Sequence, residues 1–201
     1  MEHVEDVWAD QAVESGLAVL DLRRLGDTSF EGDSLPMPGG RAYGGQVLAQ
    51  SLLAAGHTVD EDRHLHSMHG YFLRPGDASR PITFEVEVLR DGRSFSARRT
   101  HAFQDGKPIL SMIASFQLAQ DGPEHSVTMP EVPGPESVTS AIDLLAPFAG
   151  DPRADYWLQR TAFDLRHVEG SLLFQPDKSP KQYQTTWIRM RRPIEGSELL
   201  H

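Results

Sequence analysis

Residues 44–56 read Gly-Gly-Gln-Val-Leu-Ala-Gln-Ser-Leu-Leu-Ala-Ala-Gly, and the rest of the chain is best understood from this stretch. Alanine and leucine favour helix, and Gly56 stands where a helix-ending glycine, the C′ residue, is expected. Along the body of the stretch only Gln46, Gln50 and Ser51 are polar. Because a helix that is apolar almost all round is normally buried, we expect a buried central helix here.

Downstream of this helix the apolar spacing changes to a period of two. Residues 82–88 alternate between apolar and polar side chains, which predicts a half-buried strand. Asp-Gly pairs at 91–92 and 105–106 are typical of hairpin turns. Two further runs alternate in the same way and predict two more strands. In the first, one face carries Phe95, Ala97, Arg99, His101 and Phe103, and in the second, one face carries Leu110, Met112, Ala114, Phe116 and Leu118. With residues 64–74 as a fourth strand, these runs predict an antiparallel meander against the helix, an α+β domain.

The flanking regions predict how the chain is divided. Residues 4–15 are expected to form a short surface helix, and residues 17–30 a strand with imperfect alternation. We interpret residues 121–155 as a linker because they are rich in proline. Strands are expected again at 163–168 and 182–191, with a helix beginning at 197–201. Since two strands do not build an independent domain, we expect a first domain at 1–120 and an incomplete second domain at 156–201.

Composition excludes several classes of function. The 201 residues contain 39% hydrophobic and 24% charged residues, an ordinary globular composition, and no cysteine, which excludes disulfides and thiolate chemistry. A net charge of −10 argues against binding to nucleic acid, which needs clustered Lys and Arg. No apolar run approaches the roughly 18 residues of a membrane span, and the acidic start of the chain does not resemble a secretory signal. We expect a cytoplasmic protein with neither nucleic-acid nor membrane partners.

Three histidines are the most suggestive titratable group. On a regular strand His64 and His66 share one face, and His69 points to the other. We disfavour a metal site because this geometry divides the set and no further ligand lies at a convincing spacing. The remaining interpretations are a single histidine acting as general acid or base, one that lines a ligand groove, or an ordinary histidine on a sheet surface.

The glycine pair that opens the central helix allows two interpretations. Free N–H groups at a helix start could polarise a carbonyl group, as an oxyanion hole does, if Gly44 and Gly45 let it approach. Alternatively, the two glycines only permit a sharp chain entry and close packing of the helix on the sheet. The sequence favours neither.

Four stretches resemble the acyl-CoA thioesterase II family: residues 43–50, 66–77, 86–99 and 106–109. Weaker similarity returns at 163–168 and 187–189, and the dense part covers residues 17–120. The resemblance implies a hotdog fold, an antiparallel sheet wrapped around a central helix, with two such domains in one chain. It also implies hydrolysis of fatty acyl-CoA to free fatty acid and coenzyme A, without a metal or an organic cofactor.

The same resemblance assigns roles to particular positions. An Asp, a Ser or Thr, and a Gln of the second domain position the attacking water in the family, and we expect them beyond His201. His66 matches a suspected catalytic position. Gly44, Gly45 and Gln46 match the entry of the first helix near a groove, and with His69 they are the candidate substrate-binding residues.

Other interpretations and partners stay open beside this one. Basic residues near strand ends could meet coenzyme A phosphates, although most are expected to be solvated: Arg98, Arg99, Lys107, Arg189, Arg191 and Arg192. The chain could instead be an inactive acyl-CoA-binding or scaffold subunit. A hotdog dehydratase is disfavoured because its histidine-centred motif is not evident. Exposed sheet edges favour association, so a homo-oligomer is expected.

Overall fold

The computed structural model describes residues 4–170, 182–196 and 198–200. The chain divides into two compact units. The sheet unit comprises Leu17–Pro123 with Gly196–His201, and the hairpin unit comprises Met1–Gly16 with Glu124–Glu195. The predicted domain boundaries at residues 120 and 155 stay predictions.

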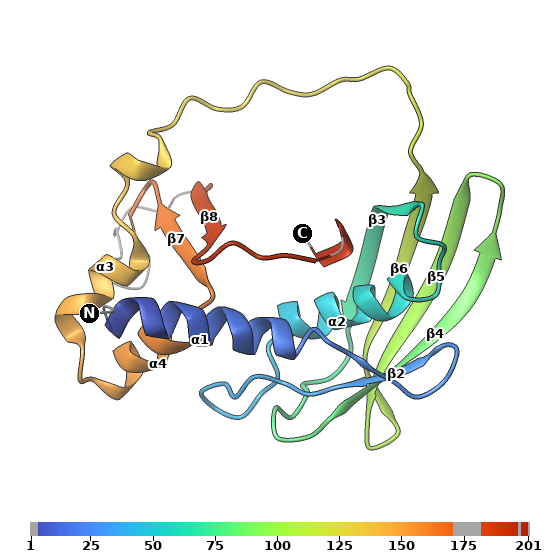
Figure 1. Ribbon diagram of the computed structural model, residues 1–201, viewed down its shortest axis with the longest axis horizontal. Helices are drawn as coiled ribbons and strands as arrows, with labels where there is room; N and C mark the ends of the chain where they lie inside the picture. Colours follow the sequence, from blue (N-terminus) through green and yellow to red (C-terminus); the bar gives the residue numbers. More distant parts are fainter. Residues whose placement is uncertain (1–3, 171–181, 197, 201) are drawn as a thin grey trace. The chain divides into compact units, whose positions relative to one another are not determined.

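The sheet unit is built on a six-stranded antiparallel sheet with strand order β1-β2-β4-β5-β6-β3 (Figure 1). The two Asp-Gly pairs lie at the β4–β5 and β5–β6 connections, as expected for hairpins. The long strand β3 forms one outer edge of the sheet. The strands are β1 (Arg23–Arg24), β2 (Ser29–Gly32), β3 (Arg63–Phe72), β4 (Ile82–Asp91), β5 (Phe95–Gln104) and β6 (Lys107–Leu118).

The central helix α2 (Gly44–Gly56) packs against one face of this sheet, the inner face (Figure 1). The predicted alternation is confirmed, because apolar residues of β4 and β6 at every second position are buried under the helix. On β5 the inner face is mostly polar, and the face that carries Phe95 and Phe103 is the outer one. The core of the sheet unit includes Phe30, Val47, Leu53, Ile82, Phe84, Val86, Leu110, Met112, Ala114 and Phe116.

Helix α2 is buried as predicted, but two details differ. Gln46, Gln50 and Ser51 are all buried, so the polar residues belong to the packed part of the helix. Gly56 is the last helical residue and not the C′ residue, and His57 follows in right-handed conformation with φ −67°. The chain therefore leaves the helix without a left-handed glycine, and the predicted C′ role is wrong.

The N-terminal region departs from the prediction. Helix α1 (Val4–Ala18) is longer than expected, and the predicted strand at 17–30 is present only as the short strand β1 and the first residues of β2. The helix is also not simply a surface helix, because Ala9, Ala12 and Val13 are buried. Residues spaced three and four apart share one side of a helix, which accounts for this buried stripe.

The hairpin unit contains the two later strands expected from the sequence. They pair antiparallel, with Leu165 opposite Ile188. A small core of Leu145, Ala154 and Leu158 packs against Trp8. No helix in the described part of the chain is long and apolar enough to cross a membrane. The elements are η1 (Pro135–Ser137), α3 (Ala141–Leu145), η2 (Ala146–Phe148), α4 (Pro152–Arg160), β7 (Phe163–His167) and β8 (Thr186–Met190), while η3 (Glu198–Leu200) belongs to the sheet unit.

Candidate functional site

The histidines of β3 are not arranged as a regular strand would place them. Leu65 pairs with Phe116 and Ser67 with Ser115, so His66 is an extra residue in a β-bulge. Beyond the bulge the alternation is shifted, and His69 pairs with Ile113 while His64 pairs with Gln117. His64 and His69 therefore share the outer face, and the prediction that His69 points to the opposite face from His64 is wrong.

His66 and His69 both lie exposed on the sheet. The His66 ring is edge-on to Phe95, with 5.8 Å between ring centroids, and His69 meets Tyr71 at 4.8 Å. Within the described residues, no carboxylate hydrogen-bonds His66 and no three His, Cys, Asp or Glu side chains gather as metal ligands. His66 thus has an aromatic neighbour but no partner that would orient its ring as a general base.

The start of α2 combines free backbone donors with two exposed aromatic rings. The first intrahelical bond runs from the Val47 N–H to the Tyr43 carbonyl, so the N–H groups of residues 44–46 precede the hydrogen-bonded ladder. A Cβ atom on Gly44 would lie 3.1 Å from Phe72, and one on Gly45 would lie 2.6 Å from Tyr43. Both aromatic residues are 59% exposed. The glycines therefore allow this close aromatic packing, and they also leave the donors accessible.

Gln46 uses its side-chain amide within the protein. Its Oε1 accepts a hydrogen bond from the Leu35 N–H at 3.0 Å, and its Nε2 donates to the Asp33 carbonyl at 3.0 Å. Its Nε2 also lies 3.3 Å from the Oε1 atom of Gln50, whose own amide donates to the carbonyls of Val19 and Asp33. These two side chains fix the incoming loop to the helix, so a ligand could bind the Gln46 amide only by displacing the loop.

Replacing Gln46 by methionine is expected to lower the free energy of unfolding by about 1–3 kcal/mol, because the Leu35 N–H and the Asp33 carbonyl lose a buried partner. Urea unfolding followed by circular dichroism measures this loss. The matched control is Gln11→Met on the exposed side of α1, expected to change stability by less than about 0.5 kcal/mol. Equal effects at the two positions would contradict the anchoring role of Gln46.

The basic residues near strand ends fall into two groups. Arg98 is buried, and its guanidinium bonds Thr58, Asp91 and backbone carbonyls, so neither the phosphate-binding nor the solvated interpretation holds for it. Arg99 is partly exposed and pairs with Glu87 at 2.9 Å. In the hairpin unit, Arg189 pairs with Glu136 and Asp164. The β4–β5 turn carries two further exposed arginines, Arg90 and Arg93, which no local sequence pattern singled out.

A buried carboxylate stands out in the hairpin unit but has a structural role. Asp164 accepts a hydrogen bond from the Ser140 hydroxyl at 2.6 Å and another from Arg166 at 2.9 Å. Burial raises the pKa of Asp164, but these hydrogen bonds outweigh it and hold the pKa below its usual value. Because the Ser140 oxygen also caps α3 through the Ile142 N–H, the group ties β7 to that helix and is poorly suited to act as a base.

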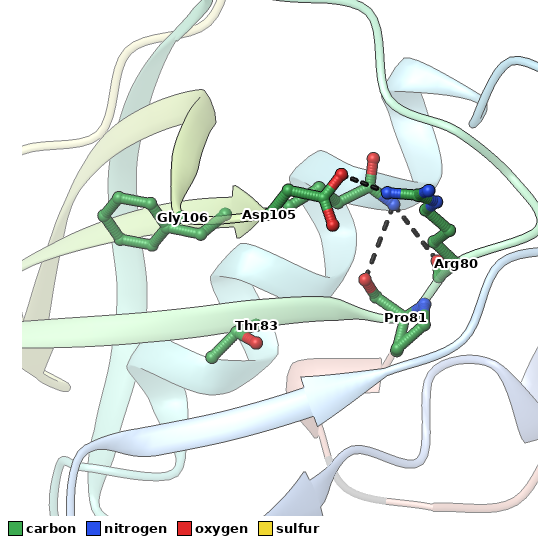
Figure 2. Close-up of a pocket in the computed structure, with 7 residues that line it drawn as sticks. Arg80, Pro81, Thr83, Asp105 and Gly106 are labelled. Atoms are coloured by element: carbon green, nitrogen blue, oxygen red, sulfur yellow. Dashed lines mark hydrogen bonds and ion pairs between the residues drawn. The ribbon is translucent and has the colours of Figure 1, made fainter.

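An open hollow of about 410 Å³ lies at the β5–β6 turn of the sheet unit (Figure 2). Arg80 at its rim pairs with Asp77 and Asp105. The Gln104 amide donates to the carbonyls of Asp77 and Arg80. The polar groups around the hollow therefore bond to one another, and the charge of Arg80 is balanced by the two aspartates. The hollow is lined by Arg80, Pro81, Thr83, Phe103, Gln104, Asp105 and Gly106.

Comparison with known proteins finds relatives that are named acyl-CoA thioesterases. Residues 33–117 match the sequence model of the acyl-CoA thioesterase N-terminal domain. Human acyl-coenzyme A thioesterase 8 is 40% identical over 195 residues, covering 91% of this chain and 60% of the relative. The chain thus spans about 60% of the length of this curated relative.

Solved structures agree with the sequence match. The acyl-CoA thioesterase II TesB2 of Mycobacterium marinum is 35% identical with a TM-score of 0.69, covering 93% of this chain and 63% of that one. A hot dog fold protein of Alicyclobacillus acidocaldarius has a TM-score of 0.73 at 22% identity, covering 92% and 66%, and it bears on the fold alone. The predicted hotdog fold is confirmed. The chain is similar to acyl-CoA thioesterases of type II, and its residues 33–117 match the N-terminal domain of acyl-CoA thioesterases.

Proposed function

We propose that this chain belongs to an enzyme that hydrolyses fatty acyl-CoA thioesters to free fatty acids and coenzyme A. The observation that carries the proposal is the match of residues 33–117 to the N-terminal domain of acyl-CoA thioesterases. In this reaction a water oxygen adds to the thioester carbonyl carbon. The C–S bond then breaks, and the coenzyme A thiolate takes up a proton.

The start of α2 is the part of the described chain best suited to this chemistry. Its free N–H groups can donate to the carbonyl oxygen as negative charge develops on it. The exposed rings of Tyr43 and Phe72 offer apolar surface to an acyl chain. We therefore propose that Gly44 and Gly45 admit the thioester carbonyl, and we keep Gln46 and His69 as proposed substrate-binding residues.

The activation of water is a separate part of the proposal. Within the described residues, His66 is a histidine without a carboxylate partner, so we propose it as an acid–base candidate only in the presence of further groups. We propose, as the resemblance implies, that the groups that activate the attacking water lie outside these residues. The lack of an oriented base among the described residues favours one alternative, an inactive acyl-CoA-binding or scaffold subunit.

Two further properties belong to the proposal. Strand β3 is the outermost strand of the sheet, and its inner-face residues Leu65, Met68 and Phe72 are exposed. An exposed apolar edge strand favours pairing with another sheet, so we propose self-association through β3. We also propose a cytoplasmic location, as the composition suggests.

Together with the groups that activate the attacking water, the protein is expected to release thiol from decanoyl-CoA, and Gly45→Ala in it is expected to lower kcat/KM about tenfold. The added methyl group would lie 2.6 Å from the Tyr43 ring and would force that ring out of its present position beside the free donors. Thiol release is followed with a chromogenic disulfide reagent. Gly122→Ala is the matched control, because a Cβ atom there meets nothing within 4 Å.

Binding of a non-hydrolysable decanoyl-CoA thioether separates the two candidate functions. Binding without hydrolysis would favour the inactive subunit over the enzyme. If the protein shows neither binding nor hydrolysis, both candidate functions are contradicted. Equal rates for the two glycine variants would show that the start of α2 has no part in the mechanism.

A further inference from the structure

The turn between β4 and β5 carries arginines that lack acidic partners. Arg90 and Arg93 are exposed, and in the part of the chain that the structure describes neither guanidinium has a hydrogen bond or an ion pair. The turn itself is held by a bond from the Gly92 N–H to the Phe95 carbonyl at 2.8 Å. Elsewhere on the sheet, exposed arginines such as Arg23 and Arg99 pair with glutamates. The positive charge at this turn is therefore available to a ligand.

Arg63, the first residue of β3, adds a third guanidinium to the same turn. Its side chain is only 11% exposed, and its Nη2 atom donates to the carbonyls of Gly92 and Arg93 at 3.1 and 3.3 Å. Its Nε and Nη1 atoms are buried without a hydrogen-bond partner. The Asp62 carboxylate lies 3.8 Å from Nε, too far for a hydrogen bond. A buried charged donor without a partner is costly, which favours an oxyanion partner here.

The acidic residue of the turn is already committed. Asp91 pairs with the buried Arg98 at 2.8 Å. A hydrogen bond with Ser96, and after it Arg98 and Arg63, hold the pKa of Asp91 below its usual value, so the carboxylate stays ionised and balances Arg98. Asp62 is largely exposed, so solvent and salt screen the attraction between its carboxylate and Arg63. Within the turn itself, Arg90 and Arg93 thus carry positive charge that Asp91 does not balance.

Three neighbouring guanidinium groups are suited to bind a phosphate. Guanidinium groups bind phosphate oxygens through paired N–H donors, and several of them suit a multiply charged group. The chain as a whole has a net charge of −10, so an anionic ligand needs such a local site to approach it. The substrate proposed above carries a 3′-phosphate and a diphosphate at its nucleotide end.

We propose that Arg63, Arg90 and Arg93 form a binding site for a phosphate group of the coenzyme A nucleotide. The inference rests on the proposed function for the identity of the ligand. The site lies at the C-terminal end of α2, because Arg98 of the same hairpin donates to the Thr58 carbonyl just beyond that helix. The thirteen residues of α2 place the free N–H groups at its start about 20 Å away. An extended coenzyme A molecule is long enough to connect the two ends.

Calorimetric titration of the full chain with adenosine 3′,5′-bisphosphate tests the site. Arg93→Gln is expected to weaken binding about tenfold, and Arg93→Lys less, because lysine keeps the charge but not the paired donors. Arg99→Gln is the matched control: it removes the same charge from the same hairpin, but from an arginine that already pairs with Glu87. Its effect is expected to stay within about twofold. Arg93 is exposed, so its variants should fold, and thermal unfolding checks that they do.

Three ligands distinguish the phosphate that is bound. If coenzyme A binds more tightly than dephospho-coenzyme A and only the former depends on Arg93, the 3′-phosphate occupies the site. If both bind equally and both depend on Arg93, the diphosphate does. Equal weakening by Arg93→Gln and Arg99→Gln, or no dependence on either, would overturn the site. Decanoyl-CoA hydrolysis is measured separately, so loss of that activity with nucleotide binding intact would count against the proposed function and not against the site.

Discussion

Replacing Arg98 by methionine is expected to lower the free energy of unfolding by about 3–5 kcal/mol, one of the largest effects of any single change in this chain. The side chain is 2% exposed and sits on the inner face of β5. Its Nε donates to the Thr58 hydroxyl at 2.8 Å, its Nη2 to the Thr58 carbonyl at 2.8 Å, and its Nη1 to the Arg90 carbonyl at 3.2 Å. Methionine fills much of the volume but leaves these acceptors without a donor.

The matched control is Arg99→Met, one residue along the same strand. Arg99 faces outward and pairs with Glu87, and an exposed pair of this kind contributes at most about 1 kcal/mol. Urea unfolding followed by far-ultraviolet circular dichroism compares the two variants. A loss at Arg98 no larger than that at Arg99 would mean that Arg98 does not link the segment after α2 to the β4–β5 hairpin.

Arg98 also illustrates why β5 could not be oriented from sequence. Its alternation puts Phe95 and Phe103 on one face and polar side chains on the other, which by hydropathy alone favours the aromatic face as the core. The reverse holds, because the polar inner face meets its partners on α2 and beyond it. Thr100 donates to the Ser51 carbonyl, and Arg98 bonds Thr58. These partners lie 40 and 49 residues away in the chain and leave no local pattern.

The sequence predicted those elements whose own apolar periodicity indicates which face is buried. Helix α2 and strands β4 and β6 each carry an apolar repeat that matches their geometry, and the Asp-Gly turns fix the connections between strands. The bulge at His66 has no such signature. It arises from the pairing of β3 with β6, so one extra residue reversed the predicted face of His69.

Part of the candidate site could be predicted from local sequence, and part could not. The glycine pair at the start of α2 was found because small residues at a helix entry have a local meaning. The resemblance makes Gln46 a candidate substrate-binding residue, whereas its bonds to Asp33 and Leu35 depend on a loop whose path the sequence does not reveal. Arg63 follows Asp62 in the sequence, so local pattern alone does not distinguish it from an arginine in an ordinary surface pair. Its unused donors become apparent only once the β4–β5 turn lies beside it.

Replacing Phe116 by alanine is expected to cost about 3–5 kcal/mol of unfolding free energy, and Phe95→Ala no more than about 1 kcal/mol. Both phenylalanines lie on neighbouring strands of one sheet, which makes them a matched pair. Phe116 is 0% exposed and packs in the core beneath α2, whereas Phe95 is 46% exposed on the outer face. Truncating Phe116 therefore leaves a cavity in a packed core, while truncating Phe95 removes a ring that water already reaches.

The choice of probe decides whether this comparison is informative. Trp8, Trp157 and Trp187 are the three tryptophans of the chain, and all belong to the hairpin unit, so tryptophan fluorescence reports on that unit. Far-ultraviolet circular dichroism follows the strands of the sheet unit and is the proper measure, with the urea midpoint taken at constant slope. A larger loss for Phe95→Ala than for Phe116→Ala would put the core on the opposite face of the sheet. It would also remove α2, with its glycine entry and the arginine turn at its far end, from the positions on which the proposed binding of acyl-CoA depends.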